Sequence, residues 1–218
     1  MRHKWMLLGL ALLILLPLTA SRSDAKGDIN FMFGLKHVEE FGDLQQSISG
    51  EDDLGNHFDF GVEMTFHGAN WPIGIAVDIL GSAREEDADY YDSYYYYGYY
   101  YTIETSTAEI DVGIRKIWEF PRNPIRPYLG GGLSIARGEV EFTAEIFDPL
   151  LGQVILSESD SDDDQGVGYW LGGGVFWRVG QSFNIGLNAR YSTADVELFD
   201  EDVDVGGVHV GVLLGWGW

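Results

Sequence analysis

The chain has 218 residues, a formal net charge of −22 and no cysteine. Its length fits one domain, and its charge argues against nucleic acid as a partner, because phosphate binding needs a basic surface. The absence of cysteine excludes disulfides, thiolate metal sites and lipoprotein acylation.

The N-terminus has the pattern of a secretory signal peptide. Arg2–Lys4 is positively charged, and residues 6–18 form an apolar run that is too short to span a membrane as a helix. We therefore predict a signal peptide over 1–25, with cleavage after Ala20 as the weaker alternative, and a mature domain over 26–218. An uncleaved anchor is the other alternative, but no stop-transfer pattern follows the apolar run.

Eight segments of the mature chain alternate apolar and polar side chains with the period of a β-strand. Each is roughly 10 to 13 residues long, which is the length that a tilted strand needs to cross a bilayer. We expect strands at 28–37, 56–66, 71–82, 107–118, 126–137, 167–178, 183–193 and 208–218.

The connections between these segments alternate in length. Four are long and hold most of the chain's 35 acidic residues, whereas the other three are short and turn-like. Outer-membrane barrels combine long external loops with short periplasmic turns in this way. A soluble β-sandwich also has short alternating strands, but it does not predict this alternation of loop lengths. The long connections are 38–55, 83–106, 138–166 and 194–206, and the short ones are 67–70, 119–125 and 179–182.

The last strand is the most informative segment. Large apolar side chains occupy every second position, including Leu214, Trp216 and Trp218, while small or polar residues fill the positions between them. Such a strand suits a bilayer, where lipid covers the outer face of a barrel and aromatic side chains lie at the interface.

Strand number, loop alternation, the terminal aromatic residue and the glycine-rich segment 127–132 resemble the eight-stranded bacterial outer-membrane barrels of the OmpA/OmpX-like and porin families. The resemblance implies an all-β fold: an eight-stranded antiparallel up-and-down transmembrane β-barrel with four long extracellular loops and three short periplasmic turns. It also implies residence in the outer membrane, with lipid and lipopolysaccharide as surroundings. The terminal strand would be an assembly signal for the barrel-assembly machinery, carried by Leu214, Trp216 and Trp218.

The inward faces of the expected strands carry many charged and polar side chains. Charges inside a narrow barrel must be paired or hydrated, so we interpret them as an ion network that fills the lumen; a gated proton or ion path is the alternative. The inward residues are Lys36, Asp59, Glu63, Asp78, Glu109, Asp111, Arg115, Asn188, Arg190 and His209.

A lipid A-modifying enzyme is the main functional alternative, and a narrow passive channel for small solutes is another. A hydrolase needs a serine, a histidine and an orienting acid on one accessible face. Ser192 and His209 are the nearest candidates, but their positions predict that both face the lumen. We therefore expect no catalytic residues and no cofactor.

Two acidic runs, residues 160–164 and 200–204, offer the oxygen ligands that suit divalent cations. The second run begins like an EF-hand loop, but Val205 and Gly211 stand where the required Gly and Glu would be. Solvated, mutually repelling loops are the simpler interpretation, and weak cation binding is the alternative. The candidate ligands are Asp160, Asp162, Asp164, Asp200, Asp202 and Asp204.

A tyrosine-rich stretch lies in the second long connection. Tyrosine combines an apolar ring with a polar tip, so these residues suit a hairpin near Gly98 that packs on itself and on lipopolysaccharide, or a surface patch that recognises a glycan or a protein. The patch comprises Tyr94, Tyr95, Tyr96, Tyr97, Tyr99, Tyr100 and Tyr101. Together these patterns predict a monomeric barrel with a structural or surface-interaction role.

Overall fold

The computed structural model describes residues 26–39, 55–68, 71–92, 97–148 and 150–218. The predicted signal peptide lies outside the described residues, as does most of the first long connection. Among the residues described, no helix has the length and apolar character that crossing a membrane would require.

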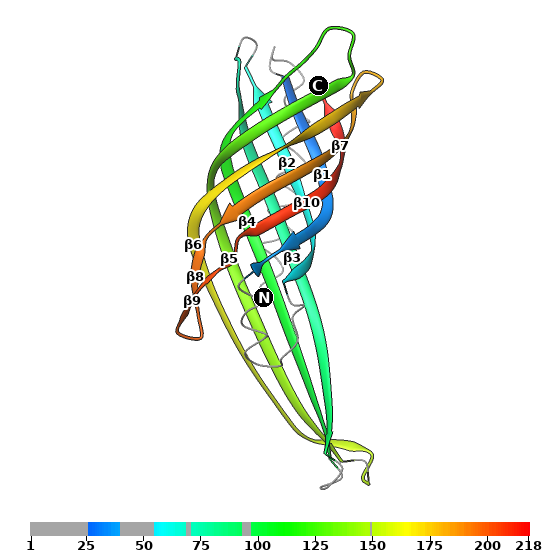
Figure 1. Cartoon of the computed structure of the whole chain (residues 1–218), viewed down its shortest axis with the longest axis vertical. Helices are drawn as coiled ribbons and strands as arrows, with labels where there is room; N and C mark the ends of the chain where they lie inside the picture. The colour runs from blue at the N-terminus through cyan, green and yellow to red at the C-terminus, as the bar shows by residue number, and fades with distance from the viewer. Residues whose placement is uncertain (1–25, 40–54, 69–70, 93–96, 149) are drawn as a thin grey trace.

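Eight antiparallel strands form a closed barrel, as the sequence predicts (Figure 1). Each strand pairs with its neighbour in the chain, and β1 pairs with both β2 and β10, so the sheet has no open edge within the barrel. The barrel strands are β1 (Lys26–His37), β2 (Asn56–His67), β3 (Gly74–Asp92), β4 (Tyr97–Ile117), β5 (Ile125–Asp148), β6 (Gln153–Val179), β7 (Phe183–Thr193) and β10 (Gly207–Gly217).

Side-chain alternation separates the two faces of this sheet. Along β7 the apolar Ile185 and Leu187 face outward, while Asn188 and Arg190 are buried inside. The same alternation runs through the other barrel strands, and it follows because successive side chains of a strand point to opposite faces. The outer face is therefore apolar and the inner face polar, which is the reverse of a water-soluble barrel.

The predicted ends of the third to sixth strands were wrong. The long connections expected at 83–106 and 138–166 are mostly strand, so β3 to β6 are 19 to 27 residues long. The hairpin expected near Gly98 is confirmed, since Tyr91 pairs with Gly98. The expectation of long loops failed because acidic and serine-rich sequence was taken to mean loop. Backbone pairing needs no apolar face once a strand has left the membrane, since water then solvates both faces.

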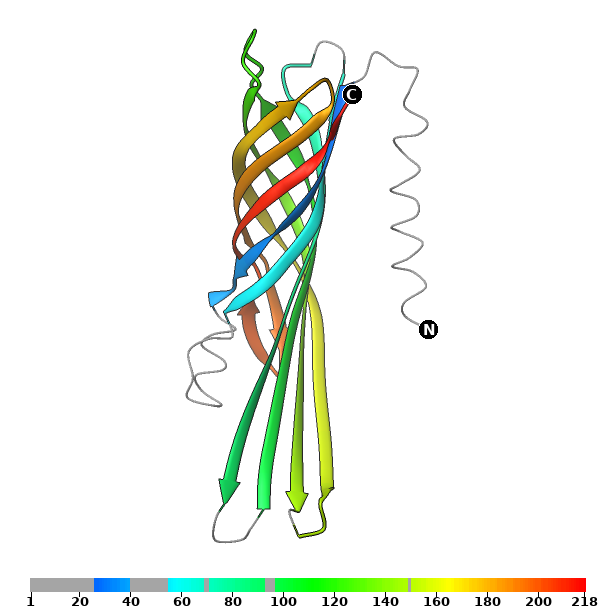
Figure 2. The same ribbon diagram turned by 90° about the vertical axis from the view of Figure 1, so that its right-hand side faces the viewer.

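The excess length of these four strands continues the barrel sheet beyond the rim (Figure 2). The pairing of β2 with β3 ends at Ala83, and that of β6 with β7 begins at Tyr169. Beyond these points β3 to β6 pair with one another, with one register shift between β5 and β6 at Ile146 and Phe147. We call this part the projecting sheet, and it comprises residues 84–92, 97–105, 140–148 and 153–162.

The fourth long connection is also structured. It forms a two-stranded hairpin of β8 (Asp195–Leu198) and β9 (Glu201–Asp204). Phe199 and Asp200 make its turn with φ angles of 53° and 65°, as a tight hairpin between right-twisted strands requires. Residues 195–204 are called the cap hairpin below.

Candidate functional site

The lumen is the candidate functional site, because it gathers the buried charges of the chain. All ten residues predicted to face inward are buried, each with no more than 5 % of its surface exposed. They come from β1, β2, β3, β4, β7 and β10, and the pairing register sets their heights in the barrel.

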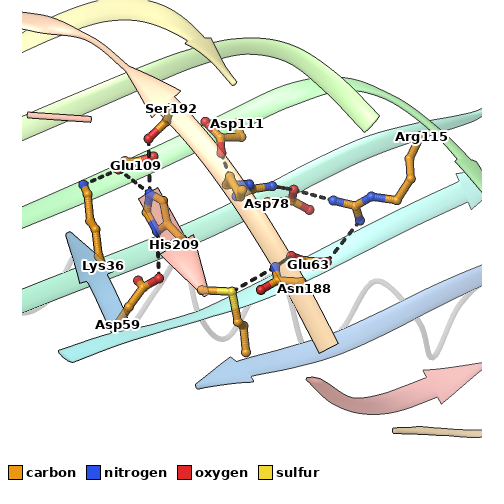
Figure 3. A network of polar contacts seen from close by, with 12 residues as sticks. Lys36, Asp59, Glu63, Asp78, Glu109, Asp111, Arg115, Asn188, Ser192 and His209 are labelled. Carbon is orange, nitrogen blue, oxygen red and sulfur yellow. Dashed lines mark hydrogen bonds and ion pairs between the residues drawn. The ribbon is translucent and has the colours of Figure 1, made fainter. Parts of the chain in front are cut away.

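Asp78 lies at the centre of the network, near Asp111 and Arg115 (Figure 3), and two arginines contact it. Both guanidiniums reach Oδ2 of Asp78: Nη2 of Arg115 lies 2.6 Å from it, and Nη2 of Arg190 is also within hydrogen-bond distance. Nη1 of Arg190 lies 2.8 Å from Oδ2 of Asp111, and Nη1 of Arg115 lies 3.6 Å from Oε2 of Glu63. Planar guanidiniums suit such a site because each can bridge two carboxylates.

Aromatic rings cover these guanidiniums on one side. The guanidinium carbon of Arg190 lies 4.5 Å from the centre of the Trp170 ring, and that of Arg115 lies 5.2 Å from the Tyr128 ring. Tyr128 in turn stacks on Phe176, with ring centres 4.4 Å apart. The rings favour the charged arginines by cation–π attraction and exclude water from that side of the network.

Glycines on β5 and β6 make room for the rings. A Cβ added at Gly174 would lie 2.9 Å from the hydroxyl of Tyr128 and closer still to backbone, and one at Gly130 would lie 3.0 Å from the Trp170 ring. Charge and polarity alone do not single out Trp170 and Tyr128 as lumen residues. The signal that could have found them is their inward position in strands that also place glycines inward, at Gly130 and Gly132 on β5 and at Gly168, Gly172 and Gly174 on β6.

A second group lies nearer the long-strand end. Nζ of Lys36 donates to Oγ1 of Thr107 at 2.8 Å and to the carbonyl of Val205 at 2.7 Å, and it pairs with Glu109 at 2.5 Å. His209 lies between two acids: its Nδ1 is 2.7 Å from Asp59 and its Nε2 is 3.4 Å from Glu109. The five carboxylates of the two groups thus face two arginines, one lysine and one histidine.

The cap hairpin covers this second group. Val196, Leu198, Val203 and Val205 are buried against apolar side chains of β4 and β5, together with Val38 at the end of β1. Gly138 on β5 lets the hairpin approach, since a Cβ there would lie 2.6 Å from a methyl group of Val205. The apolar cluster and the hydrogen bond from Lys36 to the carbonyl of Val205 hold this segment against the second group of charges.

The comparisons with known proteins agree with this architecture. A family model described as outer membrane protein beta-barrel domain matches residues 8–214. The chain belongs to this family. It is therefore an integral barrel of the bacterial outer membrane with a surface or structural role.

Several solved outer-membrane barrels are similar to this member of the family. Neisserial surface protein A is 15% identical, with 89% of this chain and 96% of that chain covered and a TM-score of 0.44. Ail of Yersinia pestis is 17% identical, with 89% and 99% covered and a TM-score of 0.43. A major outer membrane protein from Thermus thermophilus is 11% identical, with 89% and 98% covered and a TM-score of 0.46. No curated protein matched the sequence.

The two hydrolase candidates do come together in this family member. Oγ of Ser192 lies 3.2 Å from Nε2 of His209, whose Nδ1 contacts Asp59. This is the order of a serine–histidine–aspartate triad. All three side chains are at most 1 % exposed, however, and lipid outside the barrel does not reach them. The same histidine nitrogen also faces Glu109 at 3.4 Å, so these residues are part of the ion network.

The acidic candidates for cation binding do not form a cluster. Asp162 and Asp164 accept hydrogen bonds from the backbone of the cap hairpin, at Phe199 and Glu197, and Asp204 accepts from Ala194 and Gly206. Within the described parts of the chain, no group of three or more histidine or acidic side chains is arranged to hold a metal ion. Asp160, Asp200 and Asp202 are exposed.

The predicted tyrosine patch is only partly described. Tyr94, Tyr95 and Tyr96 lie outside the described residues, and so does the side chain of Tyr97. Tyr99 is half-buried in β4. Tyr100 meets Phe147 edge-on at 6.2 Å, and Tyr101 stacks on Phe142 at 5.9 Å. Tyr100 and Tyr101 therefore pack against β5.

The terminal strand has its large side chains on the outer face. Leu214, Trp216 and Trp218 are all exposed, and the Trp216 ring meets Phe31 and Phe183 edge-on. Trp218 also exchanges backbone hydrogen bonds with Gly27, and these bonds join the residue after β10 to the start of β1. This aromatic group marks the end of the barrel that carries the short turns.

We expect Arg190→Ala to destabilise the barrel strongly, because Asp111 would lose its arginine partner and Asp78 one of its two inside the lumen. The cost is roughly 3–5 kcal/mol where water stays out, and less where it enters. Denaturant unfolding of the barrel in lipid vesicles measures it. The control is Arg137→Ala, which removes an exposed pair with Asp163 at 2.6 Å and should cost about 0–1 kcal/mol. Equal losses in the two variants would contradict the buried network.

Proposed function

We propose that this barrel is a closed, non-enzymatic surface protein that displays the projecting sheet outside the cell. In this orientation the short turns and both termini are periplasmic, and the acidic long hairpins are extracellular. The barrel is a monomer surrounded by lipid and lipopolysaccharide. The barrel-assembly machinery recognises its last strand through Leu214, Trp216 and Trp218.

The projecting sheet is the observation that carries this proposal. Four strands leave the barrel together and continue for several residue pairs beyond the last contacts with β2 and β7. A membrane anchor needs no such extension, because the barrel already spans the bilayer. An extended, ordered sheet instead serves to hold a surface at a distance from the membrane.

The chemistry of the projecting sheet favours a basic partner. Along β6 the exposed Glu158 and Asp160 alternate with serines, and in this stretch β6 pairs only with β5. Acidic side chains on an edge strand discourage pairing with a second copy of the same edge. They attract an extended segment that carries lysine or arginine, which can pair with the backbone and the carboxylates together.

Closure of the lumen supports the non-conducting part of the proposal. The central arginine network fills the middle of the barrel, and the cap hairpin covers the lumen with apolar side chains on the long-strand side. An eight-stranded barrel is just wide enough for its own side chains. Passive permeation through the lumen would therefore require both the arginine network and the cap hairpin to move.

The lipid A-modifying alternative is favoured by one observation, the alignment of Ser192, His209 and Asp59. Its weakness is access, because an acyl chain in the membrane does not reach the lumen through a closed sheet. Mass spectrometry of lipid A from cells with and without the protein separates the two functions. We expect identical lipid A, and a difference that disappears in Ser192→Ala would establish the enzyme.

Cysteine labelling tests the orientation, since the chain has no cysteine of its own. Ser159→Cys lies on the projecting sheet and Gln181→Cys in the turn between β6 and β7, and both positions are exposed. A membrane-impermeant maleimide should label Ser159→Cys on intact cells. It should label Gln181→Cys only after the outer membrane is permeabilised. The reverse pattern would overturn the proposed display.

Planar-bilayer recording tests the closed lumen. We expect no steady current from the unmutated barrel, and none after the cap hairpin is replaced by a short turn, because the arginine network still fills the lumen. Adding Arg190→Ala to that deletion should open the barrel to ions. A large, steady current from the unmutated protein that rises with salt would support the channel instead.

Binding of a cationic peptide tests the surface role. A peptide of alternating lysine and valine should bind the barrel in nanodiscs, and Glu158→Gln/Asp160→Asn should weaken binding about fivefold, at about 0.5 kcal/mol for each exposed pair. The control, Glu201→Gln/Asp202→Asn, removes two exposed charges from the cap hairpin. Equal weakening by both variants would mean attraction to net charge alone, without a site on the sheet.

A further inference from the structure

The short-turn end of the barrel has a cavity that the lumen network does not use. Its volume is about 470 Å³, within the range of about 300–1,000 Å³ that small-molecule sites occupy. We call it the mouth cavity. Four basic and two aromatic side chains that line it are Lys26, Lys116, Arg126, Arg178, Trp71 and Trp218.

The mouth cavity is positive although the chain is strongly negative. Its four basic side chains are balanced by only two acids, Asp28 and Glu119. The whole chain, by contrast, has 13 lysines and arginines against 35 acids. A concave site that concentrates scarce positive charge attracts anions.

Asp28 holds the two arginines in place at the base of the cavity. Its Oδ1 accepts from Nη1 of Arg126 at 3.2 Å, from Nη2 of Arg178 at 2.7 Å and from Nδ2 of Asn184 at 2.9 Å. One carboxylate thus orients two guanidiniums. The side chain of Arg126 is only 9 % exposed, and its Nε has no acceptor among the described residues. These guanidiniums are therefore preorganised, and the Arg178 side chain, which is 24 % exposed and lines the cavity, can also meet an anion there.

Glu119 neutralises only one of the positive charges in the mouth cavity. It lies in the turn between β4 and β5 and is about half exposed, and it accepts a hydrogen bond from Nη2 of Arg126. Partial burial alone would raise the pKa of Glu119, but Arg126 and Lys26 outweigh this effect and hold the pKa below its ordinary value. The acid is therefore ionised at neutral pH, and the cavity keeps an excess of two basic groups.

The rim of the cavity lies at the membrane interface. Trp71 and Trp218 are both exposed, and tryptophan side chains lie at the level of lipid headgroups in membrane proteins. The cavity thus opens where phosphate groups of the lipids are most concentrated. If the signal peptide ends at Ala25, as the sequence predicts, the new α-amino group at Lys26 adds another positive charge beside it.

We propose that the mouth cavity binds a phosphate ester, with the headgroup of an anionic phospholipid as its source. The arginines supply fixed, planar donors for the phosphate oxygens, and Lys26 and Lys116 supply point charges at the rim. The tryptophans contact the glycerol and the upper acyl chains. A soluble phosphate ester offers the same chemistry, so the experiment must separate the two sources.

The test uses the full mature barrel in zwitterionic micelles, with the indole N–H signals of Trp71 and Trp218 followed by NMR. Short-chain phosphatidylglycerol should shift both signals, whereas short-chain phosphatidylcholine and glycerol phosphate should not. Lys26→Gln/Lys116→Gln removes two rim charges without touching the buried arginines. It should weaken phosphatidylglycerol binding at least about tenfold, since a hydrogen bond to a charged group typically contributes this much or more.

Arg122→Gln is the matched control, because Arg122 lies at the same end of the barrel and does not line the cavity. It should bind phosphatidylglycerol as the unmutated protein does. Equal shifts from glycerol phosphate would establish a phosphate site and overturn the lipid as its source. The proposal as a whole fails if phosphatidylglycerol shifts neither indole, or if Lys26→Gln/Lys116→Gln binds as tightly as Arg122→Gln.

Discussion

The closure of eight strands into a narrow barrel is the constraint on which the rest of the structure depends. Lipid outside requires an apolar outer face, and the alternation of strand side chains then directs the polar residues into a lumen too narrow for bulk water. Charges placed there must find partners or cost several kcal/mol each. The bridging of Asp78 by Arg115 and Arg190 answers that requirement. The glycines opposite them follow from the same lack of space, since only they leave room for Trp170 and Tyr128.

Most of this arrangement follows from the alternation of residues in the sequence. The two-residue period suffices to predict eight strands and to place Lys36, Glu109 and Arg190 inside, because parity needs only local information. It cannot predict which of these charges meet, since Arg190 and Asp78 are 112 residues apart and the register of the closed sheet decides their heights. It also fails at the strand ends. Beyond the rim no lipid imposes an apolar face, so the acidic ends of β5 and β6 resemble loops in sequence although they pair as strands.

The cap hairpin shows how one segment can satisfy two environments. Its acids at Asp195, Glu197 and Asp202 alternate with the apolar Val196, Leu198 and Val203. By composition alone the segment resembles an acidic loop, because the acids outweigh the apolar residues in that judgement. In the structure this alternation places the acids in solvent and the apolar side chains against β4 and β5. The run Asp200 to Asp204 therefore resembles a cation-binding loop only in spacing. Two of the neighbouring acids on β6, Asp162 and Asp164, accept backbone hydrogen bonds from the hairpin instead.

The distribution of charge along the barrel axis has a further consequence. Basic residues are scarce in this chain, yet four of them line one cavity at the short-turn end, while the projecting sheet at the other end is acidic on its exposed edge. Charges that served only solubility would not need such separation, because either sign keeps a surface hydrated. In the orientation that we propose, the acids of the projecting sheet lie far from lipid, where they repel neighbouring copies and favour basic partners. At the short-turn end, the bases lie beside Trp71 and Trp218, and the anions that we propose for them are lipid phosphates. On these proposals one barrel presents opposite electrostatic surfaces to water and to the headgroup layer, with the side chains of the lumen between them.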